Sequence, residues 1–142
     1  MKIVVIGAGG MLGSMVACVV ASRSDLDVVA TLRDPASAQS APVDAAGIQW
    51  RALDVEVATS AELTELLRGV SWVINAVGVI KPYIRDTDAA SVQRALLVNS
   101  LFPQVLATVA EECGCRVLQI ATDCVYSGTS GGYCEDTPHD AL

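Results

Sequence analysis

A glycine-rich turn near the N-terminus constrains the fold of this chain more than any other feature. A run of branched apolar residues, Ile3 to Ile6, is interrupted by four glycines before a second apolar stretch begins: Gly7, Gly9, Gly10 and Gly13. This pattern predicts a strand buried on both faces, then a tight turn, then the start of a helix. Glycine suits such a turn because the chain reverses sharply and because a phosphate can approach a backbone that carries no Cβ.

The spacing of these glycines shows which version of the phosphate-binding turn is present. The common G-x-G-x-x-G fingerprint would need a third glycine at Leu12, whereas Gly7, Gly10 and Gly13 fit a G-x-x-G-x-x-G spacing. A pyrophosphate placed here would meet the amides of the helix start, where Met11 and Leu12 lie, and the positive end of the helix dipole. We therefore predict a dinucleotide site over residues 7–13. A hydrophobic hairpin or helix with incidental glycines is the alternative.

Composition narrows the class of protein. In 142 residues, 52% are hydrophobic but only 4% are aromatic, so the apolar content comes mainly from small and branched aliphatic side chains. Such a composition suits one domain built on a buried parallel sheet. The net charge of −7 disfavours nucleic acid and anionic membranes as partners.

The uncharged stretch from residue 3 to residue 22 raises the alternative of a secretory signal. Its four glycines argue against an uninterrupted apolar helix, and against a membrane span. The five cysteines are an odd number, and only Cys113 and Cys115 lie close together in sequence. We therefore expect free thiols in a cytoplasmic protein without a metal site.

Strand and helix patterns alternate along the chain. Strands are expected at residues 3–6, 27–32, 48–53, 70–77 and 116–121, and helices from Met11 to about Val20, at 60–68 and at 88–112. Thr59 or Ser60 would cap the second helix, and residues 35–47 would form a loop or a short irregular helix. This alternation predicts a doubly wound parallel sheet of about five strands in a three-layer α/β/α fold. Ligands of such sheets bind beyond the carboxyl ends of the strands.

The residues that follow the second and third strands are therefore candidates for binding a nucleotide. Arg33 lies where an arginine would accept a ribose 2′-phosphate, which favours NADP, while the adjacent Asp34 would instead serve the 2′-hydroxyl of NAD. Asp54, followed by Val55, can accept a hydrogen bond from an adenine amino group. Ordinary roles, as a solvated loop cation for Arg33 and a carboxylate near a helix start for Asp54, stay open.

The residues after the fourth strand are small, as a chain that passes beneath a cofactor requires. This stretch is Asn75-Ala76-Val77-Gly78. Asn75 is also able to tie neighbouring strands together through its side-chain amide. Lys81 to Tyr83 follow on the same side of the predicted sheet and are candidates for contact with cofactor or substrate, or for a solvated loop.

Several of these motifs together resemble the extended short-chain dehydrogenase/reductases, and most closely the dTDP-4-dehydrorhamnose reductase group. They are the glycine turn, Leu53-Asp54-Val55, Asn75-Ala76-Val77-Gly78, Val98-Asn99-Ser100, and above all Ala121-Thr122-Asp123-Cys124-Val125-Tyr126-Ser127-Gly128 with the later Glu135-Asp136-Thr137-Pro138. The resemblance implies a Rossmann domain that binds NAD(P), a smaller C-terminal substrate lobe, and hydride transfer to a nucleotide-activated 4-keto sugar. It places at Thr122 the catalytic hydroxyl that would hydrogen-bond the reacting oxygen, and at Asn99 a structural or proton-relay asparagine.

The chain departs from the family pattern in its C-terminal part. The family's Tyr-x-x-x-Lys pair does not occur, since the only lysines are Lys2 and Lys81 and neither follows a tyrosine at that spacing. We therefore expect residues 1–142 to be the cofactor-binding portion of a longer reductase, without its substrate lobe. A noncatalytic dinucleotide-binding protein, or the same half of a sugar-nucleotide epimerase or dehydratase, are the alternatives. An incomplete sheet would also favour a homo-oligomer.

Overall fold

A parallel five-stranded sheet forms the centre of the molecule. The computed structural model describes residues 1–34 and 47–141. The strands are β1 (Lys2–Ile6), β2 (Asp27–Leu32), β3 (Ile48–Ala52), β4 (Trp72–Asn75) and β5 (Arg116–Gln119), and their order in the sheet is β3-β2-β1-β4-β5. Every pairing is parallel. The predicted doubly wound α/β fold is therefore confirmed.

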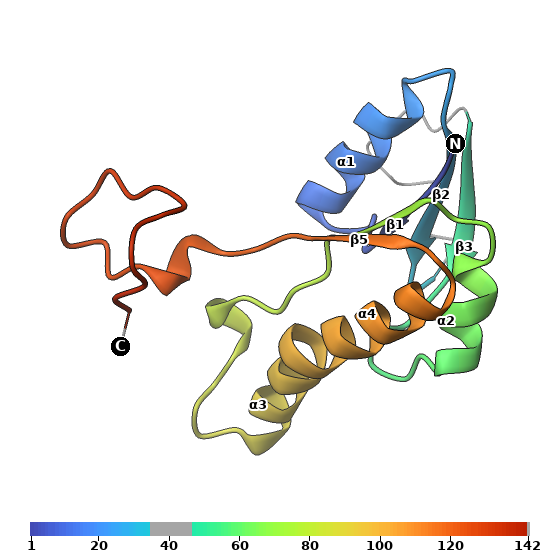
Figure 1. Cartoon of the computed structure of the whole chain (residues 1–142). Helices are drawn as coiled ribbons and strands as arrows, with labels where there is room; N and C mark the ends of the chain where they lie inside the picture. The colour runs from blue at the N-terminus through green and yellow to red at the C-terminus, as the bar shows by residue number, and fades with distance from the viewer. Residues whose placement is uncertain (35–46, 142) are drawn as a thin grey trace.

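Helices cover both faces of this sheet, as Figure 1 shows. Helix α1 (Met11–Ala21) lies on one face, and α2 (Ser60–Leu67) and α4 (Phe102–Glu112) lie together on the other. Helix α3 (Ala89–Leu96) leads into α4 through a π-helical turn, η3 (Leu97–Leu101). Two short 3₁₀ turns, η2 (Lys81–Tyr83) and η4 (Asp123–Val125), follow β4 and β5.

The core has one cluster on each face of the sheet because alternate strand residues point to opposite sides. Val4, Ile6 and Val73 face α2 and α4, and Val5 and Val28 face α1. All five are fully buried. Strand β1 thus has both faces covered, as its uninterrupted apolar run predicted.

The buried side of α1 is formed largely by small residues. The large apolar residues Met11, Met15 and Val19 are exposed, whereas Gly13 and Ala17 pack against the sheet. Small residues occupy the buried side because α1 must approach β1 closely right after the turn. Apolar spacing identified the helix but not its buried side.

Local boundary signals account for the other helices. Thr59 caps α2 as predicted: its hydroxyl oxygen accepts a hydrogen bond from the Glu62 amide, and the Glu62 carboxylate accepts one from the Thr59 amide. The helix predicted over 88–112 is interrupted by η3, just before Pro103 in the first turn of α4. The strand predicted over 70–77 is shorter, because only Trp72–Asn75 pairs. The loop predicted over 35–47 lies outside the described residues, except for Gly47.

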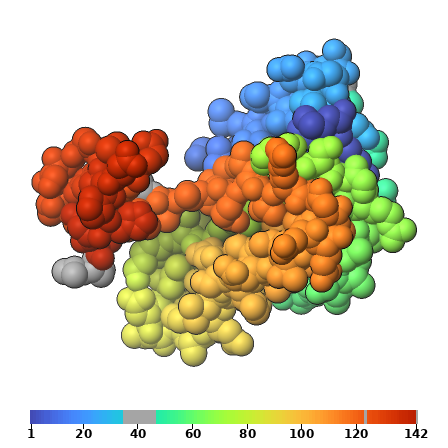
Figure 2. Space-filling model, in the orientation of Figure 1, coloured from blue at the N-terminus to red at the C-terminus, as the bar shows by residue number. Residues whose placement is uncertain are grey.

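The residues after β5 leave the sheet. Figures 1 and 2 show that they extend away from the sheet as a narrow connection and then fold into a small separate lobe. None of the described side chains from residue 120 to residue 141 is buried. We call residues 120–141 the C-terminal segment.

Candidate dinucleotide-binding site

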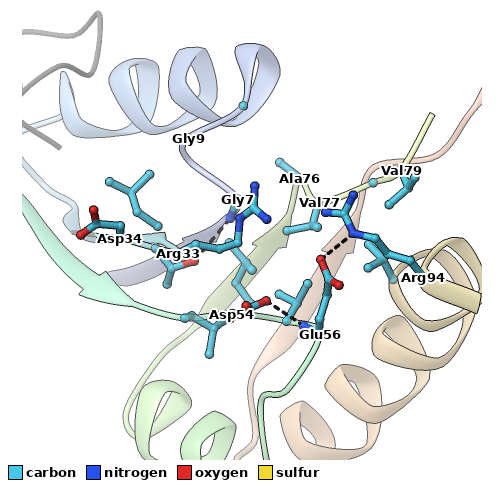
Figure 3. Close-up of a pocket in the computed structure, with 18 of the residues that line it drawn as sticks. Gly7, Gly9, Arg33, Asp34, Asp54, Glu56, Ala76, Val77, Val79 and Arg94 are labelled. Carbon is cyan, nitrogen blue, oxygen red and sulfur yellow. Dashed lines mark hydrogen bonds and ion pairs between the residues drawn. The ribbon is translucent and has the colours of Figure 1, made fainter. Parts of the chain in front are cut away.

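A cavity of about 720 Å³ opens at the carboxyl ends of the central strands. It lies between the glycine turn after β1, the ends of β2 and β3, the chain after β4, and helix α3 (Figure 3). Nine of the residues predicted to bind the cofactor line it: Gly7, Gly9, Gly10, Arg33, Asp54, Val55, Ala76, Val77 and Gly78. The fold therefore brings residues from four separate strand ends to one place, where parallel sheets bind their ligands.

Two glycines of the turn are required by the protein's own packing. Gly7 has a φ of +87°, and a Cβ there would lie 2.7 Å from Val77 Cγ2. A Cβ at Gly13 would collide with the carbonyl oxygen of Gly7. Larger residues at either position would displace α1 or the chain after β4.

Gly10 is different, because the protein itself leaves room for a side chain there. A Cβ at Gly10 would meet its nearest neighbour, the Gly7 carbonyl oxygen, at an ordinary contact distance of 3.5 Å. Its φ of −83° and ψ of 163° suit any residue. Gly10 nevertheless lines the cavity and is the N-cap of α1, with no side chain capping the helix. The packing of the protein itself therefore does not require glycine at this position. A ligand that approaches the helix amides closely would require it.

The ends of β2 and β3, together with α3, supply the charged groups of the cavity. Arg33 and Asp34 lie beside each other at the end of β2. Asp54 follows β3, and its carboxylate Oδ1 accepts a hydrogen bond of 3.1 Å from the amide of Glu56. Arg94 of α3 reaches across to Glu56, with 2.7 Å between Nε and Oε1. Charged side chains of both signs thus line the cavity, with Arg33 and Asp34 toward one side and Glu56 and Arg94 toward the other (Figure 3).

Asn75 stabilises the chain that passes under the cavity. Its side chain is fully buried, and its Nδ2 donates a 2.8 Å hydrogen bond to Gln119 Oε1 on β5. Its Oδ1 accepts from the amide of Val77, 3.2 Å away. The asparagine lies outside the cavity lining and ties β4 to β5, which is the structural role that its position suggested.

Asn99, like Asn75, stabilises the chain after β4 and does not line the cavity. Its Oδ1 accepts from the amide of Val79, and its Nδ2 donates to the carbonyl of the same residue, both at 2.8 Å. This pair of bonds fixes the loop after β4 against η3. Met11, Leu12 and Gly13 also lie outside the lining, in the first turn of α1. Direct binding roles for these residues stay predictions.

Thr122 lies in the C-terminal segment and does not line the cavity. Its hydroxyl oxygen accepts a 3.1 Å hydrogen bond from the amide of Cys124. That contact matches the ordinary role of a hydroxyl at a strand end, and the role of Thr122 in a reaction stays a prediction.

The cavity also includes residues that sequence reasoning did not select as sites, notably Glu56, Arg94 and Val98. Arg94 and Val98 are four residues apart in the α3–η3 region, so they share one face of the helical segment. That spacing was visible in the sequence, but nothing there placed this face over the ends of β3 and β4. Tyr83, noted as a candidate contact, also lines the cavity.

Other kinds of site find no support in the part of the chain that the structure describes. Across residues 1–34 and 47–141, no cluster of three or more His, Cys, Asp or Glu side chains is arranged to hold a metal ion. None of the described helices has the length and apolar character needed to span a bilayer.

Comparison with known protein families shows which family the chain belongs to. The family model described as the RmlD substrate binding domain matches residues 1–141. The chain belongs to this family. Membership confirms the resemblance to the extended short-chain dehydrogenase/reductases, a group of sugar-nucleotide oxidoreductases. No curated protein matches the chain.

Solved structures share the fold. UDP-glucuronic acid 4-epimerase from Bacillus cereus, in complex with UDP-glucuronic acid and NAD, superimposes with a TM-score of 0.80 at 23% identity, over 100% of this chain and 46% of that one. UDP-N-acetylglucosamine 4-epimerase from Bacillus cereus gives 0.72 at 17% identity, over 99% and 48%. A short-chain dehydrogenase/reductase from Saccharomyces cerevisiae gives 0.68 at 16% identity, over 87% and 54%. The chain thus spans about half the length of these proteins.

Proposed function

We propose that this chain is the cofactor-binding part of an NADP-dependent reductase that acts on nucleotide-activated 4-keto sugars. The observation that carries the proposal is Gly10, which lines the cavity at the N-terminus of α1 although the protein leaves room there for a side chain. A diphosphate close to the α1 amides accounts for that glycine. Membership of a sugar-nucleotide oxidoreductase family supports the substrate class, and the solved relative that binds NAD and UDP-glucuronic acid supports a dinucleotide.

The residues of the cavity fit the parts of such a cofactor. The glycine turn would hold the diphosphate, Arg33 a ribose 2′-phosphate, and Asp54 the adenine amino group. When bound, the nicotinamide would supply the hydride. The chain after β4, with Ala76 to Gly78, would pass beneath the cofactor without blocking it.

Arg33 is the residue that favours NADP over NAD in this proposal. A guanidinium can donate two hydrogen bonds to a phosphate, whereas it gains little from a ribose hydroxyl. Asp34, beside it in the lining, is the competing candidate and would favour NAD.

Binding measurements on purified protein test the proposal. We expect NADPH to bind, and Gly10→Ala to weaken that binding at least tenfold without changing the unfolding temperature, because its Cβ clears the protein but not a bound diphosphate. Arg33→Ala should weaken NADPH by about 10- to 100-fold, since charge-assisted hydrogen bonds contribute about 1.5–3 kcal/mol. The binding of NADH to Arg33→Ala should be the same as to the wild-type chain. Arg23→Ala, which removes a surface arginine paired with Asp25, is the control.

Turnover requires a separate assay, with the protein as its source cells produce it. NADPH oxidation on mixing with a dTDP-4-keto sugar is the expected result. Tight NADPH binding without turnover of any nucleotide-activated keto sugar would favour the second candidate, a noncatalytic dinucleotide-binding protein. The position of Thr122 favours that candidate, since the hydroxyl predicted to hydrogen-bond the reacting oxygen does not line the cavity. Absence of any dinucleotide binding would refute both.

A further inference from the structure

The loop after β3 has an ion-pair partner on a distant element. Of the four ion pairs between described residues, three join side chains two to five positions apart, at Arg23–Asp25, Arg68–Glu65 and Lys81–Asp86. The fourth joins Arg94 on α3 to Glu56 after β3, which are 38 positions apart. It is also less exposed than the others, with side-chain exposures of 42% for Arg94 and 28% for Glu56. Reduced exposure lessens the screening of such a pair by water.

This pair acts on the same short loop that presents Asp54. The Glu56 amide donates to Asp54 Oδ1 at 3.1 Å, and the Val57 amide donates to the Asp54 carbonyl at 3.2 Å. Asp54 and Glu56 are thus parts of one turn, and Arg94 holds that turn from the other side of the cavity (Figure 3). Arg94 contacts the Glu56 side chain and Asp54 contacts the Glu56 main-chain amide, so a shift of the Glu56 main chain would move the Asp54 carboxylate, and the ion pair with Arg94 restrains that shift.

The surroundings of this turn suit a flat heterocycle with a polar edge. Val55, Val79 and Val98 form part of one apolar cluster beside it and line the cavity. A base would lie against these aliphatic side chains and turn its edge toward the Asp54 and Glu56 turn. A carboxylate accepts hydrogen bonds and donates none when ionised, so it selects an amino group over a carbonyl at that edge.

We propose that the Glu56–Arg94 pair is the positioning device through which this chain selects adenine. The inference rests on the proposed dinucleotide function and adds a specificity mechanism to it. Arg94 acts through Glu56 on the direction of the Asp54 carboxylate. It is a positioning residue, and its contribution is to the choice of base rather than to affinity alone.

A general electrostatic role for Arg94 makes a different prediction. If Arg94 only attracted the phosphates, its removal would weaken all anionic dinucleotides by the same factor. If it positions Asp54, its removal changes the ratio between two dinucleotides that differ only at the base. Nicotinamide hypoxanthine dinucleotide phosphate provides that comparison, since it carries a carbonyl where adenine carries the amino group.

The experiment measures the affinities of the two dinucleotides in parallel for each variant. The wild-type chain should bind the adenine form about tenfold more tightly, the usual effect of one satisfied hydrogen bond in place of an unpaired group. Arg94→Met should bring that ratio close to one, and Glu56→Gln should retain part of it because its amide oxygen still accepts from Arg94. Arg68→Met, which removes the arginine of an exposed pair outside the cavity, should leave the ratio unchanged.

Circular dichroism at the assay temperature checks that each variant is folded. Equal weakening of both dinucleotides in Arg94→Met, with the ratio preserved, would overturn the inference and leave the proposed function standing. Equal binding of the two dinucleotides to the wild-type chain would also overturn the inference and leave the proposed function standing. Failure of the wild-type chain to bind either would overturn the proposed function as well. If Arg94→Met does not fold, the same outcomes are decided on Glu56→Gln, whose smaller change should lower the ratio without abolishing it.

Discussion

The sheet and the C-terminal segment are held by different forces. Between β1 and β5 the described chain buries apolar side chains on both faces of the sheet. Residues 120–141 bury none, and beyond Ile120, whose amide still donates to the Asn75 carbonyl of β4, they are held by hydrogen bonds among exposed groups. Burial of apolar area is the main stabilising contribution to folding, whereas a hydrogen bond exposed to water gains little over the bond it replaces. The cavity is therefore built on the stable part of the molecule, and Thr122 on the weakly held part.

Serine and tyrosine side chains organise the C-terminal segment. The Ser127 hydroxyl donates to Asp140 Oδ2, and the Ser127 amide donates to Asp140 Oδ1, both at 2.7 Å. The rings of Tyr126 and Tyr133 stack with their centroids 4.6 Å apart. These contacts are all within the segment, so they shape it without fixing it to the sheet. A reaction that used Thr122 would need further contacts to hold that hydroxyl near the cavity.

The largest effect in this comparison should come from a core substitution. Leu106 on α4 is fully buried in the cluster between α2, α4 and the sheet. Leu106→Ala should lower the free energy of unfolding by about 2–5 kcal/mol, because it removes buried methyl groups and leaves a cavity. Denaturant unfolding followed by circular dichroism measures it. Gln104→Ala, on the exposed side of the same helix, should change it by less than about 0.5 kcal/mol. A loss no greater than that of the control would mean that this core does not hold the fold.

A smaller and more local effect is expected from the C-terminal segment. Ser127→Ala removes the hydroxyl that contacts Asp140 and Tyr133. Amide hydrogen exchange in residues 124–141 should become severalfold faster, while exchange in the strands and the unfolding temperature stay the same. Mass spectrometry of peptides after exchange separates the two regions. A matched loss of protection in β1 and β4 would show that the segment and the sheet unfold as one unit.

The sequence predicts features that depend on a local pattern, and it does not predict contacts between distant residues. The strands and the glycine turn were predictable because each depends on a local pattern, such as the run from Ile3 to Ile6. The Glu56–Arg94 contact was not, because its partners are 38 positions apart and only the packing of α3 beside the end of β3 brings them together. The apolar spacing of α1 did not indicate that Gly13 and Ala17 are buried, because close packing against β1 favours small residues there.

The C-terminal segment was the hardest part to predict. Its motif carried the strongest family resemblance, at Thr122 to Gly128, but a motif fixes residue types and not the contacts that place them. Thr122 therefore lies outside the cavity lining, although Gly7, Gly9 and Gly10 of the glycine turn lie within it. Local sequence predicts elements that are stabilised by their own apolar pattern, and predicts poorly those whose position depends on partners elsewhere.

The smallest effect is a titration confined to the C-terminal segment. Hydrogen bonds to the phenolic oxygen, from the Ser127 hydroxyl when its proton turns from Asp140 to Tyr133 and from the Ser130 amide, lower the pKa of Tyr133 from 10.0 to about 8. Because the folded pKa lies below the unfolded one, this group adds to the stability of the segment fully above pH 10, and the gain is lost as the pH falls through 8. Tyrosinate absorbance should show a component with a midpoint near pH 8 that Tyr133→Phe abolishes and Ser127→Ala moves toward 10. If a component near pH 8 survives in Tyr133→Phe, it belongs to another tyrosine. The C-terminal segment would then not be organised around the Ser127–Tyr133 contact.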